Sequence, residues 1–244
     1  MSIFHFRQFD VINEASAMKV NTDGVLLGAA VTLPANCRNV LDIGTGTGTI
    51  ALMIAQRLNT VAKGFQIDAI DIDRASATEA AANFEASPWG TSLSAHHCAL
   101  EHFEARAEYD LIVSNPPYFD DSLLNPDERE STARHSISMS YRDILTWSSE
   151  HLSSAGHVAL VLPIETEAAL LREARSYGLF PCRILRIRTT PRKAARRIIA
   201  EFSFTRQDEG PAEETLTLQD PVNCPDTKDH RTPEYLNLTS EFYI

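Results

Sequence analysis

Apolar runs alternate with segments of helical period from Asn39 to about residue 180, and this alternation predicts βα units around a parallel sheet. The runs that predict parallel strands are Val40–Ile43, Ile67–Ile72, Leu93–Cys98, Tyr109–Ser114 and His157–Leu162. The segments of helical period lie near Thr49–Leu58, Arg74–Ala86, Tyr141–Leu152 and Glu165–Tyr177. Their spacing suits the right-handed crossovers that join parallel strands.

The last two apolar runs, Cys182–Arg188 and Arg197–Phe204, are joined only by residues 189–196, which is too short for a crossover helix. We therefore expect them to pair antiparallel as a hairpin. The predicted fold class is α/β, with a seven-stranded sheet that is mostly parallel and ends in a C-terminal antiparallel hairpin. Residues 207–234 contain four prolines and many acids and predict a surface excursion, whereas the apolar segment Leu236–Ile244 is expected to dock on the body.

The length of 244 residues and the hydrophobic content of 43% suit one domain with a full core. No apolar stretch is long enough to span a bilayer, and no export signal is visible at the N-terminus. The four cysteines are scattered and form no C-x-x-C pair, which argues against a disulfide framework or a zinc knuckle. We expect a soluble, cytoplasmic protein without a membrane partner.

The net charge of −11 and the pI near 5.2 argue against indiscriminate nucleic-acid binding, because the field of the whole molecule would repel phosphates. One region departs from this average. Between Phe180 and Arg206, eight basic residues face a single acid, Glu201, which gives +7 there and about −18 on the remainder. Four of these basic residues crowd the hairpin turn and are candidates for binding RNA phosphates: Arg192, Lys193, Arg196 and Arg197. The alternative is a solvated charged turn.

A glycine-rich loop, Asp42-Ile43-Gly44-Thr45-Gly46-Thr47-Gly48, follows the first strand and opens the first helix. Its G-x-G-x-G spacing differs from the G-x-G-x-x-G of dinucleotide sites and favours a nucleoside without a diphosphate. Asp71 ends the second strand, where a carboxylate can accept both hydroxyls of a ribose, while Asp73 can instead cap the next helix. The candidate cofactor residues of this region are Asp42, Gly44, Thr45, Gly46, Gly48, Asp71 and Ile72.

Asn115-Pro116-Pro117-Tyr118 follows the fourth strand, and it can form a slot for a planar amino group at the carboxyl edge of the sheet. The alternative interpretation is a proline-stiffened turn after a buried strand. The cluster His96-His97-Cys98 does not predict a metal site, because successive residues of a strand point to opposite faces.

The D-I-G-T-G-T-G loop, the acid after the second strand and the N-P-P-Y motif resemble the class I S-adenosyl-L-methionine-dependent methyltransferases of amino groups over residues 39–206. More of the chain resembles the bacterial tRNA1(Val) adenine-N6-methyltransferase family, which modifies the adenosine just 3′ of the anticodon. The segments that carry this resemblance are Gln8-Phe9, residues 17–29, Ser87-Pro88-Trp89 and residues 235–243. The resemblance implies a Rossmann-like sheet, S-adenosyl-L-methionine as cofactor and tRNA as partner.

The resemblance also implies how the chain is divided. Residues 1–244 would form one methyltransferase domain, with a cofactor-capping segment at 1–38, the core at 39–206 and a docking extension at 207–244. In the capping segment the implied cofactor contacts are Lys19, Thr22 and Asp23; the alternative is a helix start capped by Thr22 or Asp23. Ala99 stands where this group usually places an Asp beside the cofactor adenine, and its side chain cannot accept a hydrogen bond. Backbone groups or Glu101 are the expected substitutes.

In the implied reaction the Asn115 side-chain oxygen and the Pro116 carbonyl each accept one N–H of the target amine. Pro117 stiffens the slot, and Tyr118 stacks on the base. Four residues after the motif are candidates for lining the substrate approach: Arg129, Arg134, His135 and Arg142.

Other enzymes that share N-P-P-Y methylate a glutamine amide, DNA adenine or rRNA guanine. The glutamine enzymes carry a long helical domain before the cofactor loop, whereas only 41 residues precede Asp42. No DNA-recognition insertion is visible between Tyr118 and Phe180, and no added N-terminal domain of the rRNA type is present. We therefore expect a tRNA adenine as substrate and no DNA partner. The sequence does not fix the oligomeric state, and a monomer is favoured. A catalytically inactive RNA-binding module is the non-enzyme alternative, against which the intact motifs argue.

Overall fold

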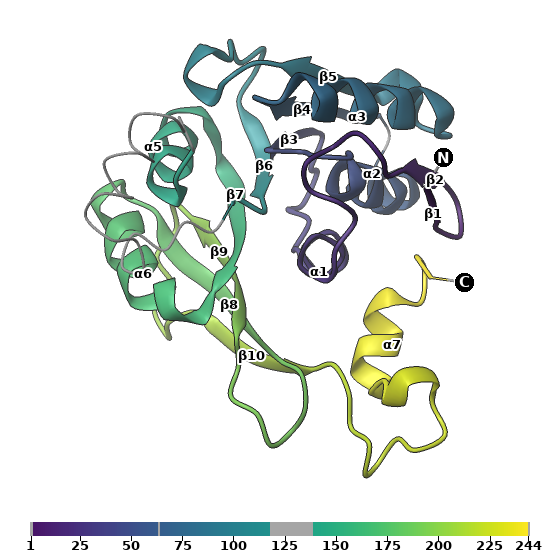
Figure 1. The fold of residues 1–244 in the computed structure, drawn as a ribbon. Helices are drawn as coiled ribbons and strands as arrows, with labels where there is room; N and C mark the ends of the chain where they lie inside the picture. The colour runs from purple at the N-terminus through teal and green to yellow at the C-terminus, as the bar shows by residue number, and fades with distance from the viewer. Residues whose placement is uncertain (1, 63, 118–138, 244) are drawn as a thin grey trace, which may run out of the picture.

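The computed structural model describes residues 2–62, 64–117 and 139–243, which form a twisted sheet with helices on both faces (Figure 1). Across the main sheet the strand order is β10-β8-β9-β7-β6-β3-β4-β5. Neighbouring strands are parallel except at β9, which is antiparallel to both β7 and β8. The strands are β3 (Asn39–Ile43), β4 (Gln66–Asp71), β5 (Leu93–His97), β6 (Tyr109–Ser114), β7 (Leu152–Pro163), β8 (Phe180–Arg188), β9 (Arg197–Ser203) and β10 (Ala212–Thr217).

The five parallel strands and the antiparallel hairpin expected from the sequence are confirmed, and β10 adds an eighth strand parallel to β8. The prediction that residues 207–234 form only a surface excursion is therefore wrong for β10. Its acids suggested solvent, but Glu213 and Glu214 meet Arg186 and Arg183 of β8 as ion pairs. A second sheet pairs β1 (Ile3–His5) with β2 (Asp10–Ile12), and strands of three residues are too short to show a period.

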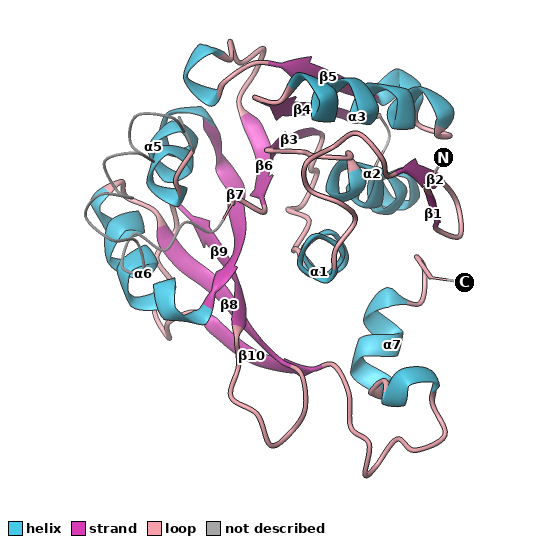
Figure 2. Ribbon diagram, in the orientation of Figure 1, coloured by secondary structure: helices cyan, strands magenta, loops and turns pink. Residues whose placement is uncertain are grey.

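The helices flank the sheet as expected for βα units, with α1, α2 and α3 on one side and α5 and α6 on the other in Figure 2. Their bounds are α1 (Thr22–Ala30), α2 (Thr49–Val61), α3 (Arg74–Ala86), α5 (Tyr141–His151), α6 (Glu167–Ser176) and α7 (Pro233–Thr239). Short 3₁₀ turns lie at η1 (Gly90–Ser92), η2 (Leu100–His102), η3 (Ile164–Thr166) and η4 (Lys228–His230). No helix in the described ranges combines the length and apolar character needed to cross a bilayer.

Two apolar cores form because successive strand residues point to opposite faces. Leu111 and Val113 of β6 pack in the core that contains α1 and α2, whereas Ile112 packs in the core beneath α5 and α6. Near the chain ends, Phe242 is buried in the first core, and its carbonyl accepts the Arg7 N–H at 2.9 Å. The two termini therefore lie close together, as Figure 1 shows.

The strand order reverses between β3 and β6, from which the chain runs outward in opposite directions. In open α/β sheets a crevice for ligands lies at such a reversal point, beyond the carboxyl ends of the two strands. The glycine loop follows β3 and Asn115 follows β6, so both sequence motifs flank this crevice.

Candidate active site

A cavity of about 710 Å³ lies at the carboxyl edge of β3, β4 and β6. It is bounded by the glycine loop, the end of β4, the segment after β5, the start of the Asn115 loop, one face of α5 and the segment before α1. Its lining residues are Ala17, Met18, Ile43, Gly44, Gly46, Ile70, Asp71, Ile72, Asp73, Ser76, Cys98, Ala99, Leu100, Glu101, Asn115, Pro117, Met139, Asp143, Thr146, Trp147 and Glu150. The sequence-predicted Gly44, Gly46, Asp71, Ile72, Ala99, Asn115 and Pro117 are thus brought together.

The glycine loop approaches the cavity closely because it can adopt left-handed backbone angles. Gly46 has φ of 56°, and Gly48 has φ of 81° with the Phe84 ring so near that a Cβ atom would lie 2.5 Å from it. Asp42 supports the loop from inside: it is fully buried, and its Oδ2 accepts the Thr45 hydroxyl at 2.7 Å. Burial raises the pKa of Asp42 to about 7. Asp42, Thr45 and Gly48 are not among the described residues that line the cavity.

Asp71 and Asp73 have separate roles, as the sequence allowed. The Oδ2 atom of Asp71 accepts the Gly46 N–H, and its Oδ1 atom accepts the Asp73 N–H, each at 2.9 Å. Burial raises the pKa of Asp71, and the two backbone donors oppose this shift. The Asp73 carboxylate accepts the Ser76 N–H at 2.9 Å as the N-cap of α3, which confirms the capping interpretation for that residue.

The opposite wall comes from the segment after β5 and from one face of α5, and sequence reasoning did not assign that face of α5 to the site. Asp143, Thr146, Trp147 and Glu150 follow the spacing of one helical face, but nothing local shows which face of α5 would meet a ligand. Ala99 lies in the wall, as expected, and Glu101 lines the same cavity. The cavity thus combines apolar surface with several carboxylates.

Asn115 is buried, with 5% of its surface exposed, and its Nδ2 group approaches two acceptors. Asn21 Oδ1 lies at 3.4 Å and Met18 Sδ at 3.6 Å. Pro116 is buried beside it and Pro117 is exposed at the cavity. Tyr118 and Arg134, together with the candidates Arg129 and His135, lie outside the described residues.

The segment before α1 reaches the cavity through Ala17 and Met18, and Lys19, Thr22 and Asp23 are not among the described lining residues. Lys19 Nζ donates to the Glu14 carbonyl. The alternative that Thr22 or Asp23 caps the helix is wrong, because Asn21 is the N-cap and Thr22 is already the first helical residue.

Ion pairs neutralise part of the basic region. Arg183 pairs with Glu201 and Glu214, Arg186 pairs with Glu167 and Glu213, and Arg197 pairs with Asp23 at 2.8 Å. Arg192, Lys193 and Arg196 are exposed in the turn between β8 and β9. Because β8 runs parallel to β7 and β6, the turn after β8 lies at the carboxyl ends of these strands, as Asn115 does.

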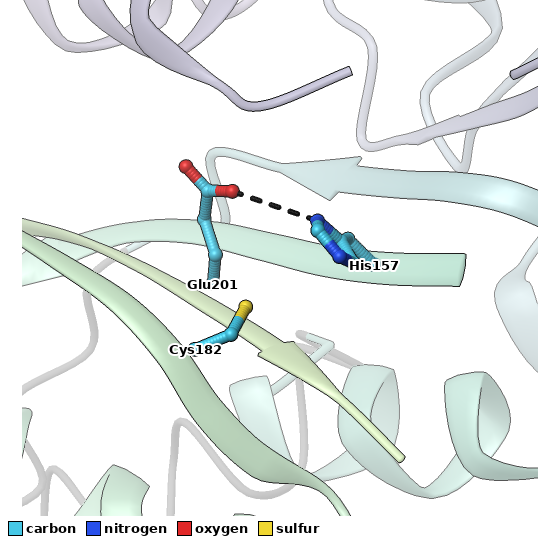
Figure 3. Close-up of side chains that lie close together, drawn as sticks. All are labelled: His157, Cys182 and Glu201. Atoms are coloured by element: carbon cyan, nitrogen blue, oxygen red, sulfur yellow. Dashed lines mark ion pairs between the residues drawn. The ribbon is translucent and has the colours of Figure 1, made fainter. Parts of the chain in front are cut away.

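His157, Cys182 and Glu201 form the one group of three potential metal ligands found in the described part of the chain (Figure 3). Glu201 is fully buried and already accepts the Arg183 guanidinium at 2.8 Å and the Thr32 N–H at 3.2 Å. Burial opposes its charge, but the contacts from His157 and Arg183 hold the pKa of Glu201 below its usual range. We infer that this cluster has a structural role, because Glu201 links β9 to the backbone just after α1. Elsewhere, His96 contacts Asp68 and His97 contacts the Ile72 carbonyl.

The sequence model of the family described as methyltransferase small domain matches residues 16–171. A tRNA1(Val) (adenine(37)-N6)-methyltransferase from Flavobacterium johnsoniae is 39% identical over 99% of both chains. A protein of the same name from Bacteroides fragilis is 40% identical over 99% of this chain and 97% of the relative.

Among solved structures, a predicted O-methyltransferase from Agrobacterium tumefaciens superposes with a TM-score of 0.63 at 16% identity, covering 90% of this chain and 96% of that one. A Listeria monocytogenes protein assigned to the class I S-adenosylmethionine-dependent methyltransferases has a TM-score of 0.58 at 14% identity, covering 88% and 71%. At these identities the likeness concerns the fold.

Proposed function

Because the chain belongs to the methyltransferase small domain family and, within it, to the tRNA1(Val) (adenine(37)-N6)-methyltransferases, we infer that it methylates the N6 amine of adenosine 37 in tRNA1(Val). The methyl donor is S-adenosyl-L-methionine. One observation supports this most: Asn115, the Gly44–Gly46 turn and Asp71 surround one cavity at the point where the strand order reverses.

The residues around the cavity fit this donor. The volume of about 710 Å³ is within the range of small-molecule sites. Each Asp71 oxygen accepts one backbone N–H and can accept a further hydrogen bond from a ribose hydroxyl. Ile72 is 53% exposed and offers an apolar surface that an adenine ring can cover. Glu101 lies in the same wall as Ala99, and we assign it as the acceptor for the adenine amine of the donor. We assign Ala17 and Met18 as the residues of the capping segment that contact the donor.

Bound S-adenosyl-L-methionine supplies an electrophilic methyl group on its sulfonium sulfur. The lone pair of the adenine N6 atom is delocalised into the ring, so the protein must localise it. We assign Asn115 Oδ1 and the Pro116 carbonyl to accept one N–H each, which makes the amine pyramidal and directs its lone pair into the cavity. No strong base is required, because the proton leaves after the nitrogen has become cationic. Positioning and preorganised acceptors of this kind contribute several kcal/mol, on the order of 3 or more.

The exposed part of the basic turn supports the RNA substrate. Arg192, Lys193 and Arg196 lie at the sheet edge that carries Asn115, so they can contact phosphates while the base enters the cavity. Arg197 is engaged with Asp23 and serves better to hold α1 against the turn than to bind RNA.

We also propose that the protein acts in the cytoplasm as a monomer, without a DNA or membrane partner. All four cysteines are free thiols, which suits a reducing compartment. Among the described residues, two of the six large apolar side chains that are exposed, Met18 and Ile72, line the cavity, so little apolar surface is left to drive self-association.

The direct test is methyl transfer to a tRNA1(Val) transcript with labelled donor, followed by digestion to nucleosides. We expect label in N6-methyladenosine, and none with a matched transcript that carries guanosine at position 37. Asn115→Ala should lower the transfer rate roughly 100- to 1,000-fold, by analogy with loss of one preorganised hydrogen bond, with little change in donor affinity. Label on the guanosine-37 transcript, or an equal loss of donor binding in the variant, would contradict the assignment.

A further inference from the structure

Asn21 is held in one orientation by the backbone around it. Its Nδ2 group donates to the Lys19 carbonyl at 3.0 Å, and its Oδ1 atom accepts the Gly24 N–H at 2.9 Å as the N-cap of α1. A carboxamide can be flipped by 180°, but a flip here would place a donor against a donor and an acceptor against an acceptor. The Asn21 oxygen is therefore fixed at the N-terminus of a helix whose residues from Gly24 to Ala30 are buried.

The same oxygen lies 3.4 Å from the Asn115 Nδ2 atom, across a gap of 94 residues in the chain. The second partner of that amide nitrogen, Met18 Sδ at 3.6 Å, is also an acceptor and cannot donate. Both contacts come from the segment before α1, and both favour the same orientation of the Asn115 amide. Its nitrogen faces residues 18–21, so its oxygen points away from them.

We propose that Asn21 is a positioning residue, which selects the Asn115 amide orientation that offers Oδ1, and not Nδ2, to the N–H of the substrate amine. This inference rests on the proposed function. An inverted Asn115 would present two donors to an amine that itself donates, and the hydrogen bond that localises the nitrogen lone pair would be lost. The backbone at the N-terminus of α1 thus fixes the orientation of the Asn21 side chain, and Asn21 in turn fixes which atom of the Asn115 amide faces the substrate amine.

A matched pair of substitutions separates this role from helix capping. Serine and aspartate cap helices about as well as asparagine. Asn21→Ser keeps a capping oxygen, but its side chain is one bond too short to reach Asn115. Asn21→Asp keeps an acceptor oxygen at the length of the native side chain.

We expect N21S to lower kcat for tRNA1(Val) about tenfold, the equivalent of one hydrogen bond, with the donor Kd and the unfolding midpoint close to wild type. N21D should restore most of that loss. The same variants can be compared without turnover by recording solvent exchange of the Asn115 Nδ2 protons by NMR, with the resonances assigned through their loss in N115A. The exchange should be about tenfold faster in N21S and near wild type in N21D.

Wild-type kcat and exchange in N21S, or an N21D enzyme as slow as N21S, would overturn the inference. Failure of the wild-type protein to modify the transcript would instead remove the proposed function, and the exchange rates would still decide whether Asn21 holds the Asn115 amide.

Discussion

Replacing Asp71 by asparagine tests the nucleoside site most directly, because the change alters one atom and one charge at the cavity wall. The two Asp71 oxygens already accept the Gly46 and Asp73 N–H groups at 2.9 Å. In D71N one of these positions becomes an NH₂ group, which cannot accept either the backbone N–H or a ribose hydroxyl. One charge-assisted hydrogen bond contributes about 1.5–3 kcal/mol, so loss of the charge and of one hydroxyl contact should cost about 3 kcal/mol, or roughly a hundredfold in Kd.

The matched control is Asp73→Asn, which removes the same charge two residues away in the same cavity wall. The Asp73 carboxylate caps α3, and asparagine is an equally good cap, so this variant should keep its donor affinity within about threefold. Isothermal titration of S-adenosyl-L-methionine into each full-length protein gives the two Kd values.

The pH dependence adds a second measurement on the same proteins. Burial raises the pKa of Asp71, so acidification should protonate this carboxyl before an ordinary one and weaken donor binding in the wild type. D71N should show a flatter pH profile. Equal losses in D71N and D73N would show that only the net charge matters, and an unchanged Kd in D71N would refute the ribose assignment.

Three further outcomes are expected. Gly48→Ala should lower the free energy of unfolding by about 2–5 kcal/mol, because its φ is 81° and a Cβ would lie 2.5 Å from a phenylalanine ring. The control Gly64→Ala, where φ is 83° but the space is open, should lower it by only about 1–2 kcal/mol, and urea titration measures both. The pKa of Asp42 is raised to about 7 from 3.8, so the fold favours its protonated form: this contribution to stability is full below about pH 4 and is lost as the pH rises through about 7. Asp42→Asn should flatten that decline in unfolding free energy, and an unchanged slope would exclude Asp42 as its source. Charge reversal of both Arg192 and Arg196 should weaken tRNA binding about tenfold or more and reduce the salt slope by about 2, and unaltered filter binding across a salt series would move the RNA footprint elsewhere.

The local sequence pattern was sufficient to predict which strands and loops border the site. The strand runs were recognisable because each is apolar and short, and the glycine loop and Asn115 follow two of them directly. Asp71 and Asp73 could also be separated in advance, since one ends a strand and the other precedes a helix. All of these signals lie within a few residues of the feature that they predict.

The local sequence did not predict which side chain each charged residue would pair with. The turn arginines read as one basic patch, but Arg197 meets Asp23, which lies 174 positions away in the chain. The acids of β10 suggested a solvated loop until the register with β8 brought them to Arg183 and Arg186. Likewise, Lys19 was expected at the cofactor, whereas its ammonium group bonds to a nearby carbonyl.

By itself, then, the sequence determined the α/β class, the order of the elements from β3 to β9 and the two loops that border the cavity, because periodicity and loop composition are properties of neighbouring residues. Only the tertiary structure decided which α5 face closes the cavity, which of the basic side chains form ion pairs, and that Asn21 faces Asn115. These depend on distances between residues far apart in the chain, and packing of the whole sheet sets those distances.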